Sequence, residues 1–179
     1  MEIELLERQS SELRKDIVEV CYHSKAGHVG GSLSAIDILN VLYFNELRID
    51  PNNPKMENRD RFILSKGHIA EALYVTLAKR GFFAYSELDN FSGYNTKYIG
   101  HPNNKVAGVE MNTGALGHGL AIGVGLAIAA KKMGQDYRTY VLMGDGELAE
   151  GSIWESAMAA GHYKLDNLCA IVDRNHLQI

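Results

Sequence analysis

The sequence predicts an α/β domain with a mostly parallel sheet flanked by helices. The clearest sign is an apolar strand over residues 137–143, a helix over about 148–162 and a second strand over 168–172, an order that makes the two strands parallel neighbours. Residues 61–64 predict another short buried strand, followed by a turn and a helix that ends at Gly81. With 179 residues, 46% hydrophobic and 22% charged, the chain has the profile of one domain with its own core.

The first part of the chain predicts two helices joined by a loop. The first helix is amphipathic and ends at residues 26–27, where a glycine follows an alanine. Its apolar positions at helical spacing are Leu6, Leu13, Ile17, Val20 and Cys21. His28 therefore enters a loop. Ser32 or Ser34 is expected to cap the second helix, which runs to about Leu47.

Two later segments are distinguished by their composition. Residues 90–112 show little periodicity, and an irregular stretch of that length inside a domain is typical of a functional loop. Residues 117–130 are rich in glycine and alanine, which predicts a helix that packs closely against a sheet or a second subunit.

Charge and cysteine content exclude several classes of function. The formal net charge is −4 and the basic residues are scattered, so no face for nucleic acid is expected. No export signal and no run of eighteen apolar residues occurs, so no membrane segment is expected. Cys21 and Cys169 are not paired in a CxxC motif, and their apolar surroundings predict two buried free thiols, as suits a reducing cytosol.

Polar residues follow both of the last two strands. Gly-Asp-Gly at 144–146 follows one strand, and Asn175 follows the next, 175 − 145 = 30 residues after the aspartate. The oxygens of Asp145 and Asn175 would then lie side by side and suit Mg²⁺ shared with a phosphate, which the amide of Gly146 can approach closely. The alternative is an ordinary strand-to-helix turn in which the aspartate caps the helix.

These residues also belong to a longer pattern. Gly-Asp-Gly-Glu at 144–147, Glu-Gly at 150–151 and Asn175 resemble the thiamine diphosphate motif of the transketolase family. Four further segments are similar to that family in the same order: Ser-Lys-Ala-Gly-His-Val-Gly-Gly-Ser-Leu (24–33), Phe-Ile-Leu-Ser-Lys-Gly-His (62–68), Gly-His-Pro (100–102) and Gly-Val-Glu-Met-Asn-Thr-Gly-Ala-Leu-Gly (108–117). The resemblance is strongest to the N-terminal chain of split transketolases. It implies a thiamine diphosphate-binding fold in which residues 1–179 form the diphosphate and Mg²⁺ domain, expected to be incomplete at its C-terminus.

The resemblance implies roles for three histidines and one acid. His28 and His68 are expected to flank the diphosphate and the reactive carbon, and His101 to reach a hydroxyl of the donor sugar. Histidines are suited to moving protons at such hydroxyls near neutral pH. Glu150 matches an acid that joins a carboxylate network across the active-site interface. His118 stands where the family usually has glutamine, and its role stays open.

Cofactor and metal contacts are implied in the same way. The positions that match cofactor-binding residues of the family are His68, Gly114, Leu116, Asp145, Gly146 and Asn175. Those that match its Mg²⁺ ligands are Asp145, Asn175 and, through its carbonyl, Leu177.

The function implied is transfer of a two-carbon ketol unit from a ketose phosphate to an aldose phosphate. The family's pyrimidine domain would come from a C-terminal partner chain, and two such pairs would form a heterotetramer. Deoxyxylulose-phosphate synthases and the E1 components of oxo-acid dehydrogenases share the Gly-Asp-Gly and Asn arrangement, and they remain alternatives. A noncatalytic module that binds Mg²⁺ and a diphosphate is the alternative from another class.

Overall fold

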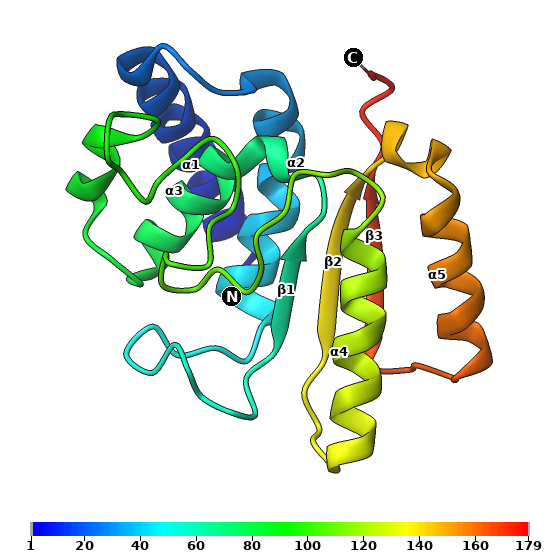
Figure 1. Ribbon diagram of the computed structural model, residues 1–179. Coiled ribbons are helices and arrows are strands. Elements are labelled where there is room, and N and C mark those ends of the chain that lie inside the picture. Colours follow the sequence, from blue (N-terminus) through cyan, green and yellow to red (C-terminus); the bar gives the residue numbers. More distant parts are fainter. Residues whose placement is uncertain (1, 179) are drawn as a thin grey trace.

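Three parallel strands form the centre of the fold, in the order β1, β2, β3 (Figure 1). The computed structural model describes residues 2–178. The strands are β1 (Arg61–Leu64), β2 (Thr139–Gly144) and β3 (Leu168–Asp173). Gly144 pairs with Asp173, so the carboxyl ends of β2 and β3 lie side by side, at the top of Figure 1. The predicted class, a parallel sheet flanked by helices, is confirmed.

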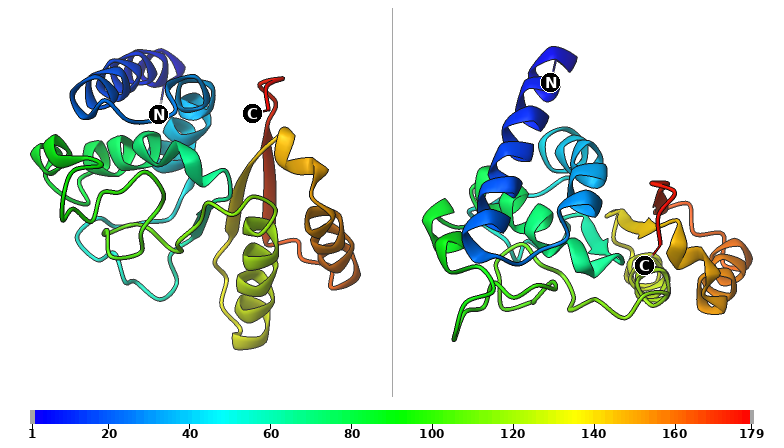
Figure 2. Two further views of the ribbon diagram at one scale, coloured as in Figure 1. Left: turned by 45° about the horizontal axis from the view of Figure 1, so that its top comes forward. Right: turned by 90° about the horizontal axis from the view of Figure 1, so that it is seen from above.

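Helices cover both faces of this sheet (Figures 1 and 2). On one face lie α1, α2 and α3, and on the other lie α4 and α5. The α-helices are α1 (Ile3–Ser24), α2 (Val29–Val41), α3 (Ala70–Arg80), α4 (Gly119–Met133) and α5 (Gly151–His162). Short helical turns are η1 (Leu42–Glu46, a π-helix) and the 3-10 turns η2 (Gly67–Ile69), η3 (Tyr85–Asn90) and η4 (Gly146–Ala149).

The two-residue period of the strands separates the two apolar cores. Phe62 and Leu64 of β1 and Leu142 of β2 point to one face, where they join the core built by α1, α2 and α3. Ile63 and Val141 point to the other face, where they pack against α4. Because both faces are covered, β1 and β2 are almost entirely apolar and buried, as in other parallel sheets.

Most predicted elements are present, and the start of the second helix is the main correction. The helix α2 begins at Val29 with His28 as its N-cap residue, so neither serine caps it. Ser32 and Ser34 lie inside the helix, and their hydroxyls donate instead to carboxylates of α3 and β3. The prediction was wrong because these tertiary acceptors are not apparent from the local sequence.

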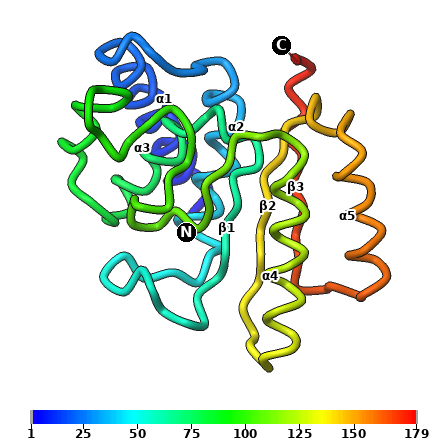
Figure 3. Tube along the Cα trace, viewed as in Figure 1, coloured from blue at the N-terminus to red at the C-terminus, as the bar shows by residue number. Residues whose placement is uncertain are grey.

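The connection between η3 and α4 contains no helix or strand over residues 91–118 (Figure 3). Buried Tyr98 and Val106 attach it to the core formed by α1, α2 and α3. The prediction of an irregular segment here is confirmed. The Gly- and Ala-rich segment is also confirmed as a helix, α4, and its Gly123 sits so close to Val141 of β2 that any side chain there would collide.

At the edge of the sheet, β3 has one neighbouring strand and several exposed residues. Cys169 lies on this strand and is exposed, so the prediction that both thiols are buried is wrong for Cys169 and confirmed for Cys21. An apolar strand pattern cannot show whether a face is covered. Among residues 2–178, no helix has the length and apolarity needed to cross a bilayer.

Candidate functional site

The carboxyl ends of β2 and β3 bring Asp145 and Asn175 together, as the sequence predicted. Asp145 follows β2, and its Oδ2 accepts a hydrogen bond of 2.9 Å from the backbone N–H of His176. The amide oxygen of Asn175 accepts a 3.0 Å hydrogen bond from the N–H of Leu177. The segment after β3 thus folds against the Gly-Asp-Gly turn, and Leu177 lies beside Asn175.

The donor chemistry of this end suits a hard cation held jointly with a phosphate. One carboxylate and one amide oxygen are available, and each oxygen that accepts one N–H still has a free lone pair. Within the described part of the chain, no three His, Cys, Asp or Glu side chains cluster as a complete metal site. Burial alone would raise the pKa of Asp145, but the N–H groups of His176 and Gly146 outweigh it and lower that pKa. The carboxylate is therefore charged at neutral pH, as an Mg²⁺ ligand must be.

Two of the predicted histidines meet next to this end of the sheet. The rings of His28, at the start of α2, and His68, in η2, stand edge to face with centroids 5.2 Å apart. His68 is two residues after Lys66. The Cβ of Lys66 lies 4.0 Å from the point that a Cβ would occupy if Gly144 had a side chain. The histidine pair therefore lies beside the Gly-Asp-Gly turn.

His101 joins the same group from the irregular connection. A Cβ on Gly114, whose φ is +147°, would fall 2.5 Å from Cδ2 of the His101 ring. A Cβ on Gly67 would in turn fall 2.7 Å from the backbone N of Gly114. Only glycine permits this layering, so the loops that carry His68, Gly114 and His101 are stacked directly on one another.

Glu150 lies against the last part of the irregular connection, which contains Leu116. A Cβ on Gly117 would fall 2.7 Å from the Cβ of Glu150, and Ser152 donates a 2.6 Å hydrogen bond to the Gly117 carbonyl. Leu116 is half-buried, and its carbonyl lies 3.1 Å from Nδ1 of the exposed His118. The N-cap of α5 is therefore fixed against the segment 114–117.

His68 is neutral at physiological pH. Burial, then the positive charge of Lys66 and the neighbouring His28 and His101, lower the pKa of His68 to about 4 from about 6.5. At pH 7 its ring can donate from one nitrogen and accept at the other, which suits contact with a polar ligand.

This low pKa predicts a stability change in the ligand-free protein. Between pH 6.5 and 4 the unfolded chain binds a proton at His68 that the folded chain does not, so the free energy of unfolding should fall as pH falls through this window. Urea unfolding at pH 7, 5.5 and 4.5 should show a steeper loss for the wild type than for His68→Gln. His162→Gln, at an exposed histidine of α5, is the control and should follow the wild type. Parallel curves for wild type and His68→Gln would contradict the assignment.

A buried ion pair lies under the site, and sequence reasoning missed it. Lys66 Nζ lies 2.6 Å from Oδ2 of Asp173, and the two side chains are 1% and 7% exposed. Ser34 of α2 donates to the other oxygen of Asp173 at 2.7 Å. This group ties α2 and the end of β1 to the end of β3. The sequence offered two signs of this pair: Asp173 is two residues before Asn175, and Lys66 is two residues before His68.

Glu147 was recognised only as part of a motif, and the structure gives it a positioning contact. Its side chain is 2% exposed. One oxygen accepts from the hydroxyl of Ser65 and from the N–H of Gly117 at 2.8 Å, and the other accepts from the N–H of Gly144 at 3.1 Å. The carboxylate thus joins three backbone segments that carry the candidate site.

Comparisons with known proteins agree with this geometry. The family described as "Transketolase, thiamine diphosphate binding domain" matches residues 7–179. One of the subunits of the apulose-4-phosphate transketolase of Phocaeicola vulgatus is 56% identical over 179 residues, which are all of this chain and 64% of that protein. Transketolase of Homo sapiens is 40% identical over 176 residues, 98% of this chain and 28% of that protein.

A solved structure extends the agreement to three dimensions. The crystal structure of transketolase from Campylobacter jejuni superimposes with a TM-score of 0.94 at 38% identity, covering 99% of this chain and 29% of that one. The present chain thus spans about two thirds of the Phocaeicola vulgatus relative and under a third of the two transketolases. The chain belongs to the transketolase family, within which it is the thiamine diphosphate-binding domain.

Proposed function

We propose that this chain is the N-terminal, diphosphate-binding part of a split transketolase, with residues 1–179 contributing the diphosphate and Mg²⁺ domain. The observation that carries the proposal is the meeting of three histidine-bearing loops with the Asp145 and Asn175 turns at one end of the sheet. The strand-to-helix turn with a capping aspartate explains Asp145 alone. It does not explain why His28, His68 and His101 gather beside it.

Mg²⁺ would be held by the oxygens of Asp145 and Asn175 and by the carbonyl of Leu177. The N–H of Gly146, which donates to Oδ1 of Asp145 in the ligand-free chain, would turn to the diphosphate, and His68 would offer a neutral imidazole. The remaining cofactor contacts would come from the backbone of Gly114 and Leu116. Because Gly114 supports the ring of His101, a cofactor bound there would lie next to a histidine that can face the sugar.

When bound, thiamine diphosphate supplies the carbanion chemistry that breaks and forms the carbon–carbon bond of the sugars. The residues of this chain would orient the substrate and move protons. His28 and His101 are exposed, so their rings are accessible to sugar hydroxyls. Each could accept a proton as a carbonyl forms and return one as a hydroxyl forms. Glu150, also exposed and beside the segment 114–117, would extend into a carboxylate network with the partner.

The partner would be a C-terminal transketolase chain with the pyrimidine domain, and two pairs would form a heterotetramer. The Phocaeicola vulgatus relative is named as one of the subunits of its enzyme, which supports a second polypeptide here. The donor would be a ketose phosphate and the acceptor an aldose phosphate. We place the assembly in the cytosol, since Cys21 and Cys169 are free thiols.

Reconstitution tests this function directly. The protein would be mixed with its partner chain, thiamine diphosphate and Mg²⁺, and sugar products would be followed with a panel of ketose phosphates that includes apulose 4-phosphate, named in the 56% identical relative. Transfer of a two-carbon unit to an aldose phosphate is expected. Deoxyxylulose phosphate or an acyl product would identify one of the other thiamine diphosphate enzymes. Cofactor binding without any turnover would favour a noncatalytic module.

His101→Ala should separate substrate chemistry from cofactor binding. The ring of His101 lies against Gly114 and not against the Asp145 turn, so the variant should bind thiamine diphosphate nearly as well as the wild type. Its kcat with ketose donors should fall roughly 10²-fold if the ring transfers a proton. Cofactor affinity by fluorescence titration and kcat by product formation would be measured together. A variant that loses cofactor affinity but keeps its kcat at saturating cofactor would contradict this placement.

A further inference from the structure

We propose that Glu71 and Tyr74 of α3 are positioning residues that hold the loops of His28 and His101 over His68. The proposal rests on the function above for its catalytic consequence, and on contacts of the described residues for its geometry. Neither side chain reaches the cofactor or metal residues directly.

Glu71 caps α2 from another helix. Its side chain is fully buried, and Oε1 accepts a 2.6 Å hydrogen bond from the N–H of His28 and a 2.8 Å hydrogen bond from the hydroxyl of Ser32. His28 is the N-cap residue of α2, whose first turn contains no acidic residue and which has no side-chain cap of its own. Glu71 therefore does from another helix what the acid of a capping box does within one helix.

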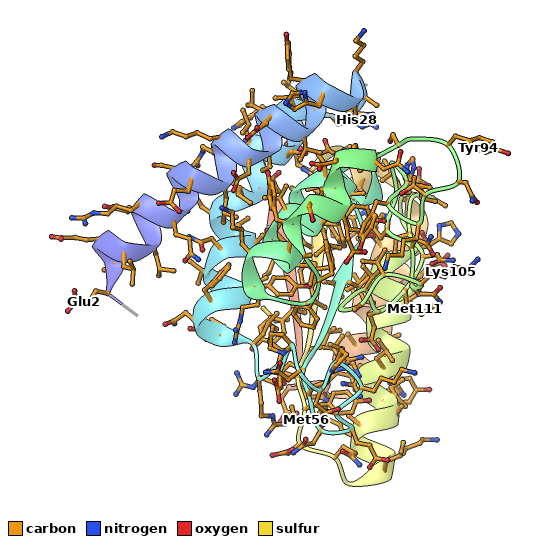
Figure 4. The ribbon with its side chains drawn as sticks, turned by 90° about the vertical axis from the view of Figure 1, so that its left-hand side faces the viewer. Glu2, His28, Met56, Tyr94, Lys105 and Met111 are labelled. Carbon is orange, nitrogen blue, oxygen red and sulfur yellow. The ribbon has the colours of Figure 1, made fainter. Side chains whose placement is uncertain are left out.

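The residue before His28, Gly27, packs directly against the carboxylate of Glu71. Gly27 has a φ of +127°, and a Cβ there would fall 2.6 Å from Sγ of Cys21 and 3.1 Å from Oε1 of Glu71. Figure 4 shows His28 near the end of α1, and the N–H of His28 reaches the carboxylate of Glu71 in α3. This path requires glycine at position 27, and it places the N–H of His28 against a buried acceptor at position 71.

Tyr74 fixes the second loop in an equivalent way. Its hydroxyl donates to the carbonyl of His101 at 2.8 Å and accepts from the N–H of Asn103 at 3.1 Å, so one buried group holds both sides of Pro102. Burial raises the pKa of Tyr74, which keeps the donor proton in place. Without that hydroxyl, the Gly-His-Pro loop would lose its two hydrogen bonds to α3.

One rigid element therefore sets the relation between all three histidines. Glu71 and Tyr74 are three residues apart, so they lie on one face of α3. His68 lies in η2, which continues directly into that helix. A displacement of either loop relative to α3 changes the distance between its histidine and His68. Misplacement of about 1 Å can cost on the order of 10²-fold in rate.

The test compares Glu71→Met and Tyr74→Phe in the protein assembled with its partner. Both substitutions keep the approximate size of the side chain and remove its hydrogen-bonding oxygen. Thr76→Val is the matched control, because Thr76 is equally buried in α3 but its hydroxyl donates only within the helix, to the carbonyl of Ala72. Hydrogen exchange followed by mass spectrometry reports loop order without any turnover. Glu71→Met should speed exchange in residues 25–33 and leave 99–104 unchanged, Tyr74→Phe should do the reverse, and Thr76→Val should change neither segment.

Kinetic coupling gives the second measurement. Tyr74→Phe should lower kcat roughly tenfold in the wild-type background and less than about twofold when His101 is already alanine. Cofactor affinity should remain within about twofold of wild type. Equal losses in both backgrounds, or an equal loss for Thr76→Val, would overturn the positioning role. If the loops loosen as expected but the wild type transfers no ketol unit, the proposed function fails and the structural role stands. If the wild type is active and both loops keep their protection in the variants, the positioning role fails alone.

Discussion

Asp145→Ala should weaken thiamine diphosphate binding by roughly 100-fold or more in the presence of Mg²⁺, beyond the 10- to 100-fold typical of losing an outer partner of a metal. Asp145 places a charged carboxylate where the joined ends of β2 and β3 meet the segment with Asn175. Its removal would leave the charge of a diphosphate and metal uncompensated. It would also remove the acceptor for the N–H of His176, which holds the segment with Asn175 in place.

Calorimetric titration of the assembled protein at saturating Mg²⁺ would measure this effect. Asp136→Ala is a suitable control, because Asp136 is an exposed aspartate that pairs with Arg48 through charged hydrogen bonds at the surface. The control should bind cofactor like the wild type. If Asp145→Ala bound thiamine diphosphate with wild-type affinity, the proposal that Asp145 is an Mg²⁺ ligand would be contradicted.

Lys66→Met should destabilise the fold by about 3–5 kcal/mol, the cost of leaving one charge of a buried pair without its partner. Asp173 would keep only the hydroxyl of Ser34 as a side-chain donor. The double variant Lys66→Met/Asp173→Leu should recover part of the loss, because no charge of the pair then remains buried. Urea unfolding followed by circular dichroism would give the free energy of unfolding for each variant.

The chain offers a control pair with the same separation. Lys131 and Asp166 are also 2.6 Å apart but on the surface, so Lys131→Met should cost only a small fraction of that amount. Similar losses for Lys66→Met and Lys131→Met would show that burial of the first pair contributes nothing.

The sequence predicted those parts of the molecule that depend on local pattern. Residues 61–64 form the expected strand, because a short, mostly apolar run that ends in a turn suits a strand covered on both faces. The meeting of Asp145 and Asn175 also followed, since parallel neighbours place their carboxyl ends at one edge.

The features that the sequence did not predict depend on contacts between residues that are distant in the sequence. Glu71 reaches the amide of His28 across 43 positions, and Lys66 reaches Asp173 across 107. Ser32 has the local features of a helix cap, but its true acceptor lies on another helix. Cys169 was expected to be buried because its neighbours in the strand are apolar. The expectation failed because the sequence of a strand does not show whether another element covers its face.

The pairing of β1 with β2 has a consequence for how the molecule folds. Arg61 pairs with Thr139, so the first contact of the sheet closes a loop of 139 − 61 = 78 residues. The helices α1, α2 and α3 pack around a core whose contacts are mostly nearer in sequence, and such contacts form fast. During synthesis we therefore expect the helical part to collapse first, and the end of the sheet that carries His68 and Asp145 to become ordered only after β2 and β3 have left the ribosome. This delay is set by the rate of synthesis, about 5–20 residues per second, because loop closure is much faster.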